Sequence, residues 1–163
     1  MRSAQIILAA LILAGCQRPV AKPLAIGGTE VENIVRSADD VTVSLLASNK
    51  EYRPSVSDYE ILEEWRELAP EVRTELREIF LKLRPKPGPA KACIPDYRVR
   101  IHFPAGADSV DVLLCLDCRI MAVYHNTKAF GVTNFDDVAP QLIAMAKEML
   151  PDDPAIQAIM TPH

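Results

Sequence analysis

The sequence predicts an α+β fold, in which an antiparallel β-sheet of meander type carries one or two helices packed on one of its faces. Two observations lead to this prediction. Apolar residues alternate with polar ones in several segments between residues 41 and 132, as in half-buried strands. Two other segments, 70–83 and 138–150, instead repeat their apolar residues at intervals of three and four, as amphipathic helices do.

The first predicted strand lies near the start of the folded part, where Val41, Val43 and Leu45 alternate with polar residues. The next segment, 57–68, has two interpretations. A short strand near 58–63 is one of them. A helix is the other, because Ile61, Leu62, Trp65 and Leu68 also have helical spacing and because Ser57 and Glu60 match a capping box.

A helix over 70–83 is predicted more strongly. Pro70 suits the first helical turn, where its missing N–H leaves no hydrogen bond unmade. The expected buried stripe consists of Val72, Leu76, Ile79, Phe80 and Leu83. The proline-rich run 84–89 ends the helix. We expect the stripe to pack against the even-numbered residues of the segment 110–124.

The segments 97–104 and 110–124 form the centre of the predicted sheet, with a turn at 105–108 between them. Every even position from Val110 to Tyr124 is apolar or weakly polar. This unbroken phase favours one long strand bent by a bulge, or two strands joined by a three-residue loop, because a two-residue hairpin at 117–118 would reverse it.

A turn at 125–128, a short strand at 129–132 and a final helix complete the predicted domain. Asn134 or Asp137 is the expected cap of that helix. Its apolar stripe consists of Val138, Leu142, Met145, Met149 and Leu150. Pro151 ends it, and Asp153 with Pro154 is expected to start one last turn.

The first sixteen residues indicate where the protein is located. Arg2 precedes a wholly apolar run, Ile6 to Leu13, which is far shorter than the ~20 residues that a membrane-spanning helix needs. The following Leu-Ala-Gly-Cys, ending at Cys16, resembles the lipobox of bacterial lipoproteins. The resemblance implies a signal peptide over 1–15, cleavage before Cys16, and lipid (including a fatty acyl chain such as palmitate) on that cysteine.

A membrane-attached protein of the bacterial cell envelope, facing the periplasm, is therefore expected. Gln17 favours the outer membrane, because an Asp after the lipidated cysteine commonly signals retention at the inner membrane. Residues 16–38 contain two prolines and two glycines and are expected to form a lipidated tether. Residues 39–163 are expected to form a single domain.

The charge of the chain limits its direct partners. The chain has 18 basic and 22 acidic residues, which gives a net charge of −4, or −5 once Arg2 leaves with the leader. Nucleic acids and anionic lipid surfaces select for clustered Lys and Arg. The expected partners are therefore the membrane, through the lipid on Cys16, and another protein of the envelope, with no nucleic acid.

Three cysteines stay in the domain when Cys16 carries lipid, and an oxidising envelope favours a disulfide between two of them. If 97–103 and 109–116 form a hairpin around residues 104–108, Cys93 or Ile94 lies across from Cys118. This register predicts a disulfide between Cys93 and Cys118, with Cys115 as the free thiol. Pairing of Cys115 with Cys93 or with Cys118 stays open, since it needs a shifted register or a sharp turn.

The same cysteines support an alternative function in metal binding or thiol redox chemistry. Cys93, Cys115 and Cys118 with His102 or His125 would make a Cys₃His zinc site. A thioredoxin-like dithiol is disfavoured, because its first cysteine needs a helix N-terminus and 115–118 lies in a strand pattern. His102 has the polar parity of its strand and is expected to be solvated.

No catalytic motif is recognisable in the sequence. It contains no G-x-S-x-G elbow, H-E-x-x-H motif, phosphate loop or EF-hand loop. The acidic pairs at 136–137 and 152–153 lie beside helix ends and are better explained as caps. We therefore expect a non-enzymatic accessory or binding module with no cofactor, no catalytic residue and no metal ligand.

One wider resemblance covers residues 40–132. The order of Cys93-Ile-Pro, a strand, and an apolar strand ending in Cys115-Leu-Asp-Cys118 is similar to a group of uncharacterised small secreted proteins and lipoproteins of bacteria. That group carries a C-x-P segment and a C-F-x-C pattern, whereas this chain has Leu116 in place of the aromatic residue. The resemblance favours a strand near 58–63 and implies no activity.

Overall fold

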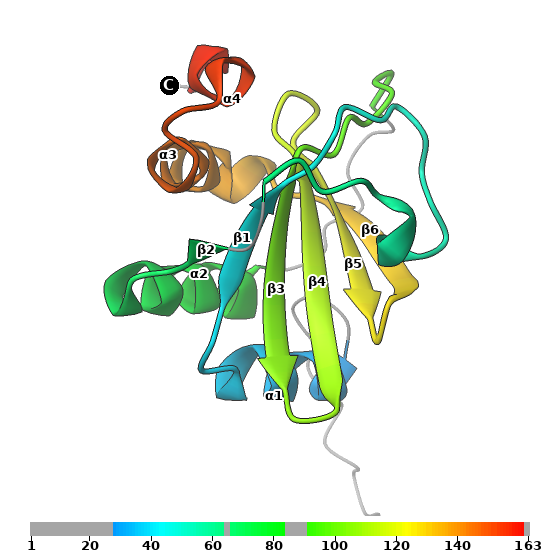
Figure 1. Ribbon diagram of the computed structural model, residues 1–163, viewed down its shortest axis with the longest axis vertical. Helices are drawn as coiled ribbons and strands as arrows, with labels where there is room; N and C mark the ends of the chain where they lie inside the picture. Colours follow the sequence, from blue (N-terminus) through cyan, green and yellow to red (C-terminus); the bar gives the residue numbers. More distant parts are fainter. Residues whose placement is uncertain (1–27, 64–65, 84–90, 162–163) are drawn as a thin grey trace, which may run out of the picture.

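The architecture is that of an open six-stranded antiparallel sheet with helices, which confirms the predicted α+β class. It comes from a computed structural model that describes residues 28–63, 66–83 and 91–161 (Figure 1). The strand order is β2-β1-β3-β4-β5-β6, so the last four strands form a meander. The expected leader, Cys16 and residues 16–27 of the expected tether lie outside the described residues.

The elements follow one another in this order: α1 (Gly28–Ser37), β1 (Thr42–Leu45), η1 (Val56–Asp58), β2 (Arg66–Glu67), α2 (Pro70–Lys82), β3 (Val99–Ala105), β4 (Asp108–Cys115), β5 (Ile120–His125), β6 (Lys128–Asn134), η2 (Asp136–Val138), α3 (Ala139–Met149) and α4 (Pro154–Ala158). The two η elements are short 3₁₀ turns.

The helices share one face of the sheet, which we call the helix face (Figure 1). Its core joins the buried sides of α1, α2, α3 and α4 to one parity of each central strand. The opposite face, which we call the second face, has a smaller core beneath the segment 46–59. That core consists of Leu46, Val56, Tyr59, Tyr97, Leu113, Cys115, Cys118, Ile120, Ala122 and Tyr124. Strands β4 and β5 are thus largely buried on both faces, whereas β2 and most of β6 are exposed.

Helix α1 corrects the predicted domain boundary. The sequence predicts a tether up to residue 38, but the structure has a ten-residue helix over Gly28–Ser37. Val31, Ile34 and Val35 are buried in the core of the helix face. Three apolar residues at positions i, i+3 and i+4 make a complete stripe for so short a helix. The folded domain therefore begins by residue 28, and Asp39 is too late a start.

Helix α2 confirms the prediction for 70–83, ending at Lys82 with Leu83 as its C-cap. Leu76, Ile79 and Phe80 are buried, and Val72 packs partly buried against the same core. The Phe80 ring meets the Phe103 ring edge to face, with centroids 5.7 Å apart. The proline-rich stop lies outside the described residues.

The segment 57–68 follows the extended interpretation in its described part. Leu46 and Ile61 form an isolated antiparallel bridge, and Arg66–Glu67 forms the short edge strand β2. The helical interpretation is wrong there, and the Ser57–Glu60 capping box does not form. Ser55 caps η1 instead, with its side chain accepting from the backbone N–H of Ser57. Trp65 lies outside the described residues.

The turn between β4 and β5 overturns the predicted strand phase. Cys115 pairs with Ile120, so residues 116–119 form a four-residue turn rather than a bulge or a three-residue loop. The phase reverses there: Val112 and Leu114 face the helices, whereas Ala122 and Tyr124 lie on the second face. Because both faces are buried, either parity of β5 can be apolar, and alternation could not reveal the reversal.

The C-terminal helices follow the prediction except at one cap. Strand β6 follows a two-residue turn at Asn126 and Thr127, both with positive φ, and extends beyond the predicted 129–132. Helix α3 starts after the 3₁₀ turn η2, and its N-cap is Val138, with no side-chain cap hydrogen bond. The expected capping of this helix by Asn134 or Asp137 is therefore wrong. Asp153 does cap the last helix, accepting from the N–H of Ile156 at 2.8 Å.

Candidate functional site

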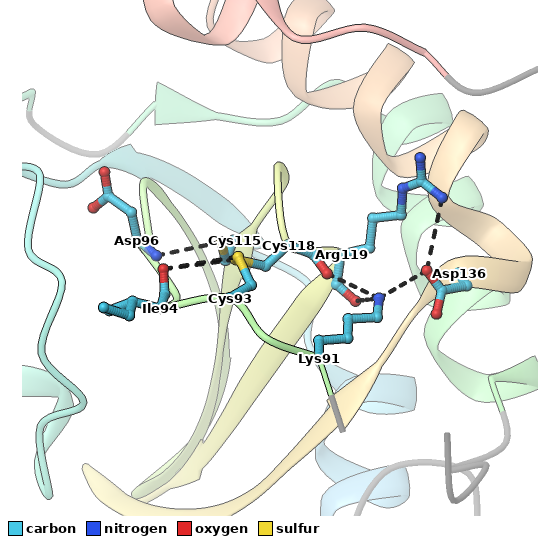
Figure 2. The surroundings of a disulfide bond; sticks show 8 residues. All are labelled: Lys91, Cys93, Ile94, Asp96, Cys115, Cys118, Arg119 and Asp136. Carbon is cyan, nitrogen blue, oxygen red and sulfur yellow. Dashed lines mark hydrogen bonds and ion pairs between the residues drawn. A yellow bond between two sulfur atoms is a disulfide. The ribbon is translucent and has the colours of Figure 1, made fainter. Parts of the chain in front are cut away.

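The cysteines predicted as a pair lie where the segment 91–97 crosses the β4–β5 turn. Cys118 is the third residue of that turn, and the structure joins it to Cys93 in a disulfide with a Cα–Cα distance of 6.0 Å (Figure 2). A crosslink that closes a span of about 26 residues stabilises a domain by ~3–4 kcal/mol on the loop-entropy model. The pair therefore acts as a clamp between the segment 91–97 and the sheet.

The hairpin register differs from the one predicted from sequence. The hairpin register is set by Val99 opposite Leu114, and its extension places Pro95 across from Cys118. The ladder ends before it reaches the cysteines, so register does not bring them together. They meet because the four-residue turn places Cys118 beside the segment that leads into β3.

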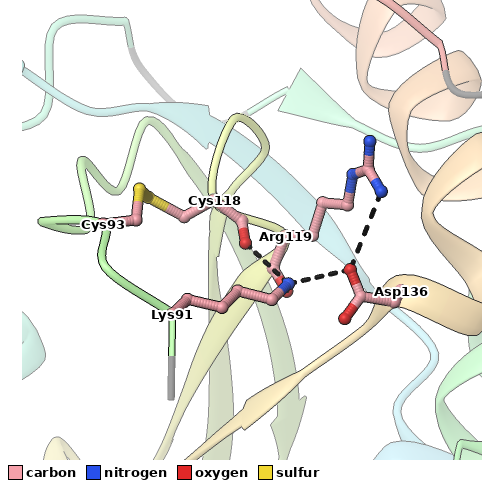
Figure 3. Close-up of polar contacts among 5 residues, drawn as sticks. All are labelled: Lys91, Cys93, Cys118, Arg119 and Asp136. Carbon is pink, nitrogen blue, oxygen red and sulfur yellow. Dashed lines mark hydrogen bonds and ion pairs between the residues drawn. A yellow bond between two sulfur atoms is a disulfide. The ribbon is translucent and has the colours of Figure 1, made fainter. Parts of the chain in front are cut away.

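Lys91 holds the same turn from its other side (Figure 3). Its ammonium donates to the carbonyl oxygens of Cys118, at 2.8 Å, and Arg119, at 3.3 Å. It also pairs with a carboxylate oxygen of Asp136 at 2.8 Å, and the Arg119 guanidinium lies 3.8 Å from that oxygen. The β4–β5 turn is thus fixed by one covalent bond and by an ionic cluster.

Cys115 is the free thiol of the described residues, and it is buried. The backbone N–H of Asp96 lies 3.3 Å from its sulfur and donates to it. Burial raises the pKa of the Cys115 thiol, an effect that hydrogen bonds from the backbone at Cys118 and Asp96 partly offset. A raised pKa disfavours the thiolate, which is the nucleophilic and metal-binding form of cysteine.

The three cysteines of the alternative Cys₃His site lie close together, but the two candidate histidines contact other residues (Figure 2). Within the parts of the chain that the structure describes, no group of three or more His, Cys, Asp or Glu side chains could hold a metal ion. His102 lies beside Asp111, and the Nε2 atom of His125 is 3.9 Å from Glu30. The disulfide also occupies the thiols of Cys93 and Cys118.

The second face carries a buried ionic cluster that the sequence interpretation missed. Asp111 is 1% exposed, and one of its carboxylate oxygens accepts from Nε of Arg100 at 2.8 Å. The Nδ1 atom of His102 lies 2.8 Å from the same oxygen. His102 is therefore only partly solvated, since its side chain is 24% exposed and lies against Asp111. The available signal was Asp111 itself, an acidic residue within an otherwise apolar strand.

Strand β1 adds polar side chains next to this cluster. Thr42 pairs with His102 and Ser44 with Arg100 in the β1–β3 ladder, so their side chains share the second face. The hydroxyl oxygens of Thr42 and Ser44 and the second carboxylate oxygen of Asp111 are buried without a hydrogen-bond partner among the described atoms. The β1–β3 half of this face is consequently polar, whereas the β4–β5 half is apolar.

Tyrosines attach the segment 52–59 to the apolar half. The Tyr124 hydroxyl donates to the carbonyl oxygen of Arg53 at 2.7 Å, and the backbone N–H of Arg53 donates to the Tyr59 hydroxyl at 3.0 Å. Tyr59 meets the rings of Tyr97 and Tyr124 edge to face. Burial raises the pKa of the Tyr97 and Tyr124 hydroxyls above the ordinary tyrosine value. These hydroxyls hold the fold and are not poised for proton transfer at neutral pH.

The largest exposed apolar side chains on a strand belong to β6. Phe130 is 52% exposed and Val132 is 53% exposed, and β6 is an edge strand of the sheet. Exposed apolar residues on a sheet edge are typical of surfaces that bind another chain. The sequence predicts a strand here but not its position at the edge of the sheet. The exposed surface was therefore not predicted.

No helix among the described residues combines the length and the apolar character needed to cross a bilayer. No protein-family model, curated protein or solved structure matches the chain.

Proposed function

We propose that the protein is a lipoprotein of the bacterial cell envelope whose domain is a non-enzymatic accessory or binding module. The sequence Leu13-Ala14-Gly15-Cys16 behind a short apolar run carries this proposal. Lipid on Cys16 attaches the chain to a membrane on its periplasmic side, with Gln17 directing it to the outer membrane. Several acyl chains, each contributing ~0.8 kcal/mol per buried CH₂, hold a protein firmly without a spanning helix.

The structure supports the compartment and the class of function in two ways. A disulfide between Cys93 and Cys118 suits an oxidising compartment such as the periplasm. The two buried carboxylates have structural partners: Asp111 pairs with Arg100, and Asp153 caps α4 and pairs with Arg98 at 3.1 Å. A module of this kind acts by binding another envelope component.

Replacement of Cys16 tests the anchor. Cys16→Ser should leave an unprocessed or soluble product, whereas the native chain should partition into detergent at its mature size. Cys115→Ser is the matched control, because it also removes one thiol but keeps the anchor. A Cys16→Ser chain that partitions like the native protein at the mature size would contradict the proposal.

The alternative, a metal or redox protein built on Cys93, Cys115 and Cys118, makes a different prediction. Thiols counted with and without denaturant, together with a metal assay on protein from the periplasm, distinguish the two functions. One thiol that reacts only after unfolding, and no metal, agrees with the module. Three protected thiols with stoichiometric zinc or copper would establish the alternative.

A further inference from the structure

The outer edge of β6 has backbone groups that bond to no other strand of the sheet. The backbone N–H of Phe135 points inward, toward β5, and donates to the carbonyl oxygen of Arg119. The backbone N–H of Ala129 points outward, away from β5, and donates to the carbonyl oxygen of Pro54. Inward and outward groups alternate along an antiparallel strand. The bulge opposite Val123 and Tyr124 interrupts this alternation before residue 131. Counting back from Phe135, which points inward, the N–H and C=O of Asn134 and of Val132 therefore point outward.

Among the described residues, this part of the edge lacks the usual protection against pairing. Natural edge strands are guarded by charged side chains, by proline or by a covering segment. Residues 129–135 contain no charged residue and no proline. The segment 54–56 covers the edge at Lys128 and Ala129, through an isolated bridge and two backbone hydrogen bonds. Beyond that point Phe130 and Val132 are half exposed.

We propose that β6 is a self-association surface, to which a second copy of this chain adds its own β6 in antiparallel orientation about a two-fold axis at Thr133. In this register Val132 of each copy faces Asn134 of the other. The outward N–H and C=O groups of both residues then form four hydrogen bonds across the axis. The joined sheets make a continuous sheet of twelve strands, from two copies of six.

A second copy fits this edge because the edge is complementary to itself. The axis at Thr133 pairs every outward donor with an acceptor and brings no charged side chain opposite a like charge. The two Thr133 side chains lie side by side, a favourable cross-strand pair. The exposed side chains of Val132 lose contact with water at the same time. The contact is an isologous interface, which closes as a dimer and does not propagate.

Cysteine crosslinking of the purified full chain tests the register. Thr133 faces itself across a non-hydrogen-bonded pair, where Cα atoms are ~4.5 Å apart and a disulfide fits. Thr133→Cys should therefore form a crosslinked dimer under mild oxidation, and its digest should contain one peptide joined to its own copy through the two introduced thiols. Phe130→Cys is the matched control. It is more exposed and lies on the same strand, but its two copies would be six residues out of register, ~20 Å apart.

The proposal predicts about tenfold more crosslinked dimer for Thr133→Cys than for Phe130→Cys, although random collisions would favour the more exposed thiol. Adding Val132→Pro to the Thr133→Cys chain should remove the dimer. The N–H of Val132 faces outward, and edge strands tolerate proline at such positions. If the proline variant has lost its native circular dichroism, Val132→Lys replaces it, since lysine guards natural edges.

Equal crosslinking of the two cysteine variants would overturn the proposal. So would a crosslinked Thr133→Cys dimer that survives both Val132→Pro and Val132→Lys. For the unmodified chain, sedimentation equilibrium in density-matched detergent should show a monomer–dimer equilibrium that Val132→Lys shifts to monomer. A native chain that stays monomeric at every concentration would also overturn it. None of these readouts requires the lipid on Cys16. The proposed self-association can therefore fail while the proposed anchor holds, and the anchor can fail while the self-association holds.

Discussion

Each face of the sheet carries a buried core, but the two cores are held in different ways. The helix face is an apolar core in which helix stripes meet one parity of the strands. The second face is half apolar and half ionic. Its contacts are a disulfide, a tyrosine cluster under the irregular segment 46–59, and the Arg100–Asp111 pair between β3 and β4. Periodic packing therefore holds one face, and specific individual contacts hold the other.

The largest effect is expected on the helix face. Phe80→Ala and Leu114→Ala each remove a fully buried side chain, and the structure around such a cavity generally relaxes only in part. We expect each to lower the free energy of unfolding by ~3–5 kcal/mol, measured by denaturant titration. A loss below about 0.5 kcal/mol at both positions, the range of surface substitutions, would contradict the assignment of this face as the main core.

On the second face, Asp111→Asn tests the ionic cluster. The substitution keeps the size of the side chain but removes the negative charge beside Arg100, whose side chain is 11% exposed. The expected loss of unfolding free energy is ~2–3 kcal/mol.

Asp136→Asn is the control for this prediction, because it breaks an ion pair with Lys91 in which the carboxylate is about half exposed. Such pairs contribute at most about 1 kcal/mol. If Asp111→Asn costs no more than Asp136→Asn, then the cluster does not hold the second face.

A smaller effect is expected at alkaline pH, from the tyrosines of the second face. Burial raises the pKa of Tyr97 and Tyr124, so the folded state keeps their protons where the unfolded state releases them. Their contribution to stability is complete below the ordinary tyrosine pKa of about 10 and is lost as the pH rises above it, by up to ~1.4 kcal/mol per pH unit for each group. Urea unfolding between pH 8 and about 11 measures this slope. Tyr97→Phe should reduce it, and a flat profile would contradict the burial.

The helix face was largely predictable from sequence, and the reason is its periodicity. The stripe of α2 and the alternation in β3 each indicate one buried side, and both are confirmed. Helix α1 was missed, because its stripe of Val31, Ile34 and Val35 is short and lies behind a segment rich in proline and glycine.

The second face was much less predictable. Apolar residues on both sides of β5 hide the change of phase at the β4–β5 turn. Arg100 and His102 are the polar residues that alternate with the apolar residues of β3. In a sheet with one solvent-exposed face, such side chains would be solvated. Both side chains instead contact Asp111 from the next strand, and such contacts between strands are not visible in the pattern of either strand.

Peptide mapping of the non-reduced protein, isolated from envelopes with free thiols blocked, most directly tests the claim that individual contacts hold the second face. We expect one crosslinked peptide pair that contains Cys93 and Cys118, with Cys115 recovered as a blocked thiol after unfolding. A crosslink that contains Cys115, or three free thiols at positions 93, 115 and 118, would contradict it.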